Sequence, residues 1–240
     1  MKGLFNLKWW MDLFEEFDLY LQGFSMTLRV SIVGLLVAIM LGVLFGVLYS
    51  TKRKPLKLIA RVYIEIFQNT PLVIQIFFYY SCLPYLIGGR VDKFLLGVMG
   101  VGIYHGAYVA EVIRTGIEAV PKGQLEAANS QGFSYIQAMR YIILPQTIKI
   151  IMPPLANQAL NLVKNTSVLA MVAGLDLMYF ADSWASSSGG HYTQGYLVCA
   201  AMYFVICFPL ASLARYLERK AKEPPKPKHP SKAVKTEVAQ

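Results

Sequence analysis

Residues 126–145 read EAANSQGFSYIQAMRYIILP, and this polar stretch interrupts a chain that is otherwise apolar enough to lie in lipid. Helix-favouring residues precede Gly132, and glycine commonly stands just past the end of a helix. Ser134 followed by Gln137 three positions later forms a capping-box pattern that starts a second helix. Because proline disfavours helix continuation, we expect Pro145 to end this second helix. The stretch therefore predicts two short helices at an angle that project from a membrane.

The composition also points to a membrane protein. The 240 residues are 55% hydrophobic and only 15% charged, with a mean hydropathy of +0.44, whereas soluble domains have about 25% charged residues. The net charge of +9 could suggest a nucleic-acid partner. However, Lys and Arg flank the apolar segments instead of forming one basic face, and residues 134–145 lack a run of base-reading Arg, Asn and Gln. We therefore expect no nucleic-acid partner.

Five apolar segments each predict a membrane-spanning helix, which requires about 20 residues. The second segment contains Pro71 and Pro84, so we expect it to be kinked or shortened. The fourth contains the pair Pro153–Pro154, where we expect a break between an approach helix and the spanning part. The segments cover residues 25–49, 65–90, 94–110, 142–173 and 196–213.

Small residues recur at every fourth position of the first segment, at Gly34, Ala38, Gly42 and Gly46. This spacing places them on one helix face, where another helix can approach closely. Before this segment, residues 1–22 read as an amphipathic interfacial helix with aromatic side chains toward lipid, at Trp9, Trp10, Phe14 and Phe17.

The distribution of Lys and Arg sets the expected orientation, since cytoplasmic loops carry the excess of these residues. The loop at 52–57 and the chain after 214 are basic, so five spans place the N terminus outside and the C terminus inside. We expect an all-α membrane protein with five transmembrane helices in residues 23–218. Its long cytoplasmic loop covers about residues 115–144, and residues 219–240 form a Pro- and Lys-rich disordered tail.

The polar stretch carries a family resemblance. Glu126-Ala127-Ala128, Gly132 and Leu144-Pro145 resemble the EAA loop of membrane permease subunits of ABC importers. The blocks NTPLVIQIFFYY (69–80), AEVIRTGIEAVPKGQLEAANSQG (110–132) and LPQTIKIIMPPLANQALNLVKNTSV (144–168) resemble the branch for polar amino acids. The resemblance covers most of residues 20–220.

The resemblance implies a partnership. In that family the loop forms coupling helices that dock on a dimer of ATPase subunits, and two permease subunits, identical or homologous, surround a shared pathway. It also implies an extracytoplasmic amino-acid-binding protein and a multi-pass location in the bacterial inner membrane. Because the chain has no GxxxxGK[ST] motif, we expect it to be no enzyme and to need no cofactor of its own, with ATP bound by the partner subunit. The cysteines have no metal-ligand spacing, so no metal is expected.

Polar residues within spans are costly and usually face a cavity. Pathway lining and interhelical hydrogen bonding are the two interpretations of those in this chain, whereas His105 reads as a hydrogen-bonded packing residue in preference to a proton relay. The candidate pathway residues are Gln68, Asn69, Thr70 and Gln75 in the second span, and Asn157, Gln158, Asn161, Lys164, Asn165, Thr166 and Ser167 in the fourth.

The resemblance also bears on the substrate. Relatives that carry cationic amino acids tend to have carboxylates at the positions of Gln158 and Asn165, and the family often has arginine at the position of Gln68. The neutral amides here disfavour arginine, lysine and histidine, because a buried cation would lack a counter-charge. Glutamine suits the amides, and Lys164 could serve glutamate or aspartate. The alternative function is an ion-gradient-driven secondary carrier, for which the sequence shows neither an internal repeat nor an intramembrane titratable pair.

Overall fold

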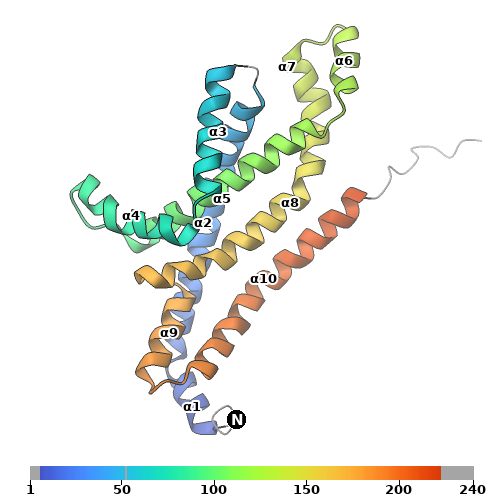
Figure 1. The fold of residues 1–240 in the computed structure, drawn as a ribbon. Coiled ribbons are helices and arrows are strands. Elements are labelled where there is room, and N and C mark those ends of the chain that lie inside the picture. Colours follow the sequence, from blue (N-terminus) through green and yellow to red (C-terminus); the bar gives the residue numbers. More distant parts are fainter. Residues whose placement is uncertain (1–5, 52, 223–240) are drawn as a thin grey trace, which may run out of the picture.

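The computed structural model describes residues 6–51 and 53–222, and every regular element within them is a helix. Long helices run through the body, α1 and α9 lie at one end, and α6 and α7 lie at the opposite end (Figure 1). The α-helices are α1 (Leu7–Glu15), α2 (Phe17–Ser50), α3 (Lys54–Gln68), α4 (Leu72–Ile87), α5 (Lys93–Glu118), α6 (Lys122–Ser130), α7 (Tyr135–Ala138), α8 (Leu144–Asn165), α9 (Leu177–Ser187) and α10 (Tyr192–Lys222).

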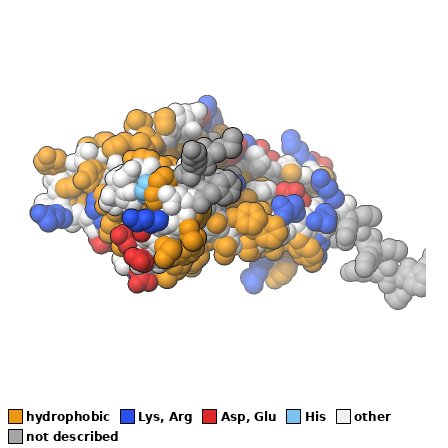
Figure 2. Space-filling view, turned by 90° about the horizontal axis from the view of Figure 1, so that it is seen from below, with side chains coloured by type: hydrophobic (Ala, Val, Ile, Leu, Met, Phe, Trp, Pro, Cys, Tyr) orange, Lys and Arg blue, Asp and Glu red, His pale blue; other side chains and the backbone are white. Residues whose placement is uncertain are grey.

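The described helices fit a multi-pass membrane protein. Three of them, α2, α5 and α10, are long and apolar enough to cross a membrane, and the number rises to five if each of two bent helix pairs forms one span. Large apolar side chains on α2, such as Ile32, Leu36 and Met40, are exposed at four-residue spacing. Figure 2 shows hydrophobic side chains over much of the face seen from below, with charged groups in patches between them. The all-α membrane fold predicted from the sequence is confirmed.

The small-residue face of α2 packs against α5, as the four-residue spacing predicts. Gly34, Ala38, Gly42 and Gly46 are all buried. A Cβ atom at Gly46 would lie only 2.8 Å from the carbonyl oxygen of Ala110. The absence of side chains at these glycines therefore allows close contact between the two helices.

The second predicted span consists of two helices, because α3 and α4 meet at a bend of 100°. Pro71 stands at the N-cap of α4, where its missing N–H costs no helical hydrogen bond. The predicted kink is confirmed at this elbow, whereas Pro84 lies inside α4 without ending it. In Figure 1, α4 extends sideways from the body.

The predicted end at Pro145 is wrong. A π-helical segment, η1 (Met139–Ile143), joins α7 directly to α8, so the second loop helix continues into the fourth span. Pro145 occupies the first turn of α8, a position where its missing N–H is tolerated.

The predicted break at Pro153–Pro154 is also wrong, because α8 continues through both residues. Membrane helices tolerate such prolines where neighbouring helices support them, and α8 packs against α5 and α10. The helix instead ends in a 3₁₀ segment, η2 (Thr166–Val172), before a bend of 45° to α9. Ala173 and Leu175 have positive φ angles of 52° and 59° at this bend.

The two ends of the chain were predicted to form an interfacial helix and a tail. Phe14 is 60% exposed, but the Trp9 ring stacks on His191 with centroids 4.0 Å apart, and Phe17 packs against a buried cluster around Trp184. Trp9 and Phe17 thus contact other parts of the protein while staying partly exposed, and the interfacial role of residues 1–22 stays a prediction. At the other end, α10 extends to Lys222, and the predicted tail from residue 223 onward lies outside the described residues.

Candidate functional site

A polar cavity of about 210 Å³ lies between α5 and α8. Gln158, Asn161 and Asn165 lie on one face of α8, because residues three and four positions apart are neighbours on a helix. Asn161 and Lys164 are exposed, so one side of the cavity is open in this single chain. The lining residues are Tyr104, His105, Tyr108, Gln158, Asn161, Lys164 and Asn165.

His105 links two of the lining amides across the two helices. It is 2% exposed in the middle of α5. Its Nδ1 lies 3.3 Å from Oε1 of Gln158, and its Nε2 lies 3.0 Å from Nδ2 of Asn165. An amide oxygen only accepts and an amide nitrogen only donates, so Nδ1 donates and Nε2 accepts, as in one neutral tautomer. The interpretation of His105 as a hydrogen-bonded residue is confirmed.

Two tyrosines of α5 form another wall of the cavity. The hydroxyl groups of Tyr104 and Tyr108 lie 3.0 Å apart, and the Tyr108 hydroxyl donates to the backbone oxygen of Gln68 at 3.5 Å. The Gln68 side chain points elsewhere, since its Nε2 donates to the carbonyl oxygen of Ala107 at 3.2 Å. Gln68 thus fastens α3 to α5 beside the cavity and is not among the residues that line it.

The other predicted residues of the second span bond locally at the α3–α4 elbow. Asn69 Nδ2 donates to the Glu65 carbonyl oxygen at 2.8 Å, and Thr70 Oγ1 donates to that of Ile66 at 2.8 Å. Gln75 is buried, and its Nε2 donates to Thr70 Oγ1 at 2.7 Å. The contacts of Asn69 and Thr70 are local to the bend and are not interhelical hydrogen bonds, and Gln75 Oε1 is buried without a partner among the described residues.

Three predicted residues of the fourth span also lie outside the polar cavity. Asn157 donates to Glu218 on α10 at 2.9 Å. Thr166 is fully buried and donates to the Val163 carbonyl oxygen at 2.7 Å. Ser167 donates to the backbone oxygen of Lys164 at 2.8 Å and borders a more apolar cavity between α8 and α10.

The polar loop has the predicted helix–turn–helix form. Gly132, between α6 and α7, has a φ of +81°, a left-handed conformation that favours glycine. Ser134 Oγ accepts from the backbone N–H of Gln137 at 3.4 Å, and the Gln137 side chain accepts from the Ser134 N–H at 2.8 Å. The glycine turn and the capping box are therefore confirmed.

The loop presents a mixed surface. Glu126 and Ala127 are exposed on α6, whereas Ala128 is buried. Leu144 is 38% exposed and Pro145 is exposed beyond the π-helical segment. Sequence reasoning missed the apolar residues at the tip, where Tyr135 is 58% and Ile136 is 76% exposed. In the sequence, these two residues could have been recognised as a pair of large side chains directly after a helix-capping residue.

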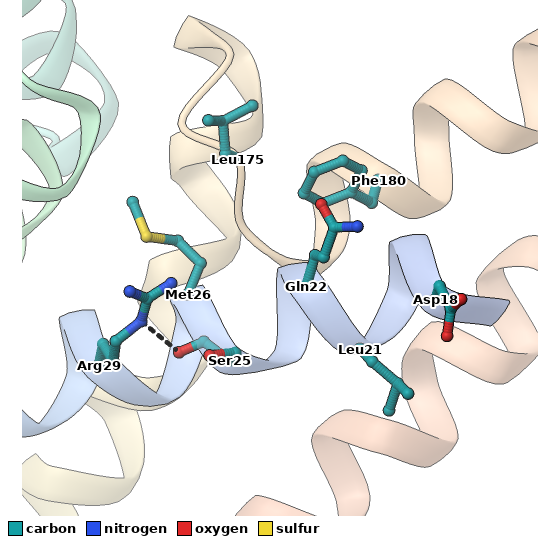
Figure 3. A pocket seen from close by; sticks show the side chains of 8 residues that line it. All are labelled: Asp18, Leu21, Gln22, Ser25, Met26, Arg29, Leu175 and Phe180. Carbon is teal, nitrogen blue, oxygen red and sulfur yellow. Dashed lines mark hydrogen bonds between the residues drawn. The ribbon is translucent and has the colours of Figure 1, made fainter. Parts of the chain in front are cut away.

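A second cavity, of about 540 Å³, lies at the end of α2 opposite to the polar loop. Figure 3 shows Asp18 and Arg29 at its two ends, with Leu175 and Phe180 facing them across the space. Arg29 Nε donates to the Ser25 carbonyl oxygen at 3.4 Å. Asp18 and Arg29 lie on one face of α2, roughly three helical turns apart.

Comparison with known proteins shows relatives along most of the chain. The family model "Binding-protein-dependent transport system inner membrane component" matches residues 34–223. The "Probable glutamine ABC transporter permease protein GlnM" of Bacillus subtilis is 47% identical over 208 residues, covering 87% of this chain and 95% of the relative. The "Arginine transport system permease protein ArtQ" of the same organism is 32% identical, covering 84% and 92%.

Solved structures agree with the fold. "Crystal structure of an amino acid ABC transporter with histidines" has a TM-score of 0.79 and 33% identity, covering 88% of this chain and 97% of that chain. A structure of the MetNI methionine ABC transporter has a TM-score of 0.75 at 15% identity, covering 87% and 99%. This second likeness concerns the fold alone.

Proposed function

The chain belongs to the family of binding-protein-dependent transport system inner membrane components, and from this premise we propose that it moves a polar amino acid into the cytoplasm. It is a multi-pass protein of the inner membrane and acts as the permease subunit of an amino acid ABC importer. Glutamine, glutamate and aspartate are the favoured substrates, and the name of the GlnM relative adds weight to glutamine.

The observation that carries the substrate proposal is the lining of the cavity between α5 and α8, which combines amides with the ammonium group of Lys164. Gln158 and Asn165 contribute amides, and among the described residues none that lines this cavity is a carboxylate. A cationic side chain would lose hydration there without gaining a counter-charge. The names of relatives include both glutamine and arginine, so the names alone do not decide the substrate. The residues that line the cavity are the more direct evidence.

The open side of the cavity supports a paired permease. Asn161 and Lys164 are exposed in the single chain, and a volume of about 210 Å³ is below the range of roughly 300–1,000 Å³ for ligand pockets. A second permease subunit, identical or homologous, would complete the walls. Closure from both sides would also exclude water and strengthen the hydrogen bonds to substrate.

The polar loop is the proposed contact with an ATPase dimer. Glu126, Ala127 and Ile136 are exposed at the end of the molecule where α6 and α7 lie. Because α7 continues through η1 into α8, a displacement of the loop would move the helix that carries Gln158 and Asn165. ATP would be bound and hydrolysed by the partner, and this chain would need no cofactor of its own. A separate amino-acid-binding protein would deliver the substrate from outside.

The test is uptake by the complete complex of permease, ATPase and binding protein in proteoliposomes. We expect labelled glutamine to accumulate only with ATP inside and with a catalytically active ATPase, and unlabelled arginine to compete poorly. Uptake that persists without ATP and collapses with an ionophore would instead establish the secondary carrier. Efficient uptake of arginine or lysine would overturn the substrate assignment while leaving the importer intact.

A further inference from the structure

His105 constrains Gln158 and Asn165 to opposite hydrogen-bonding roles. A neutral imidazole has one N–H donor and one acceptor nitrogen. Its Nδ1 faces Oε1 of Gln158 at 3.3 Å and its Nε2 faces Nδ2 of Asn165 at 3.0 Å. If the ring adopted the other tautomer, both amides would have to turn over together. The ring therefore always binds one amide by its oxygen and the other by its nitrogen.

The amide atoms that do not contact the His105 ring therefore also have opposite hydrogen-bonding roles. With the observed contacts, Gln158 retains its NH₂ group and Asn165 retains its carbonyl oxygen. Within the described part of the chain, neither of these atoms has a hydrogen-bond partner, and both residues line the polar cavity. These two side chains thus offer the cavity one donor and one acceptor, seven residues apart on α8, beside the other polar lining residues, which include Asn161 and the ammonium group of Lys164.

This pair of groups matches a carboxamide better than a carboxylate. A carboxamide carries one acceptor oxygen and one donor NH₂, so it can satisfy both wall groups. An ionised carboxylate has only acceptors, so it would place an oxygen against the oxygen of Asn165. An unsatisfied polar group in a closed site is costly, which makes a missing hydrogen bond an effective basis for discrimination.

We propose that His105 is a positioning residue that fixes the amides of Gln158 and Asn165 in opposite orientations, and thereby makes the cavity select a carboxamide side chain over a carboxylate one. This inference rests on the proposed function, since it assigns the side chain of the transported amino acid to the cavity between α5 and α8. His105 itself need not touch the substrate. Without the ring, both amides could turn their NH₂ groups toward a carboxylate.

The experiment is equilibrium binding of labelled glutamine to the purified permease–ATPase complex without the binding protein, with glutamate and methionine as competitors. The three ligands share their α-amino and α-carboxylate groups, so differences report on the side-chain end. His105→Phe keeps a ring and removes both nitrogens, and His105→Asn keeps one donor and one acceptor. His191→Phe, which changes the histidine that stacks on Trp9, is the matched control.

We expect the parent and His191→Phe to prefer glutamine over glutamate by at least about tenfold. His105→Phe should lower this preference to within about threefold while glutamine affinity changes less, and His105→Asn should retain part of the preference. An unchanged preference in His105→Phe would overturn the role of His105, as would an equal loss of affinity for every ligand. If His105→Phe fails to assemble, His105→Leu is judged by the same outcomes. A parent complex that binds no amino acid would contradict the proposed function itself.

Discussion

Asn157 and Glu218 are hydrogen-bonded across α8 and α10, with Asn157 Nδ2 2.9 Å from Glu218 Oε1. The contact is partly buried and lies one residue from Gln158, yet on a different face of α8. We expect Asn157→Leu to destabilise the complex by about 1–2 kcal/mol, because a hydrogen bond to a charged group is lost. A lower midpoint of thermal unfolding in detergent checks this. The amino-acid profile should stay that of the parent, and a changed profile would contradict the assignment of Asn157 to packing.

The turn at Gly132 should tolerate Asn better than Val. The residue has a φ of +81° with open space where a Cβ would stand, so the cost of substitution comes from the backbone and not from a clash. Asn is enriched in this left-handed region, whereas a β-branched residue is strongly disfavoured there. We expect Gly132→Val to abolish ATP-driven uptake with normal membrane insertion and Gly132→Asn to retain most of it. Equal uptake by the two variants would show that the turn does not limit coupling.

Charge reversal on the exposed face of α6 should separate ATP hydrolysis from transport. Glu126 is exposed, and its carboxylate has no ion pair in the described part of the chain. We expect Glu126→Lys to reduce substrate-stimulated ATPase activity of the reconstituted complex by about tenfold or more, with Glu126→Gln intermediate. Co-purification shows whether the ATPase dissociates. Parent-like stimulation in Glu126→Lys would exclude Glu126 from the contact.

Two carboxylates in the cavity should admit a cation. The variant Gln158→Glu with Asn165→Asp places acids on the two residues that contact His105, so arginine or lysine would gain a counter-charge. Binding to the permease–ATPase complex without the binding protein measures this directly. We expect arginine to bind detectably and glutamate to bind at least about tenfold more weakly than in the parent, through like-charge repulsion. A parent-like profile would exclude these residues from the substrate site.

The orientation predicted from Lys and Arg can be tested on two exposed serines, Ser130 at the end of α6 and Ser187 at the end of α9. Each is changed to cysteine in a background without Cys82, Cys199 and Cys207. A thiol reagent that cannot cross the membrane is applied to cells whose outer layer lets it through. It should label Ser187→Cys and spare Ser130→Cys. The opposite pattern would invert the topology.

Features with a local cause could be predicted from the sequence. The capping box at Ser134, the turn at Gly132 and the small-residue face of α2 depend on residues close along the chain, and the structure contains all three. Of the polar residues in the fourth span that were predicted to line the pathway, Gln158, Asn161, Lys164 and Asn165 lie around one cavity, whereas Asn157, Thr166 and Ser167 lie outside it. The tyrosines of α5 were missed because aromatic residues within a span have no distinctive pattern.

Features that depend on neighbouring helices could not be predicted. Pro145 was expected to end a helix, but the π-helical segment before it places it in a first turn, where proline is accepted. Gln75 was expected in the pathway because it is polar, but the 100° elbow supplies it with local partners. In each case the outcome depends on tertiary geometry, which propensity alone does not specify.

The π-helical segment at Met139–Ile143 has an evolutionary consequence. Such a segment amounts to one residue inserted into an α-helix. A lineage that lost one residue there would regain an ordinary helix and rotate the loop by about 100° about the helix axis, the angle per residue for 3.6 residues per turn. The cavity residues, which lie further along α8, would keep their register. Alignment gaps among homologues at this point would therefore mark different docking angles on the ATPase, with the amino-acid site inherited unchanged.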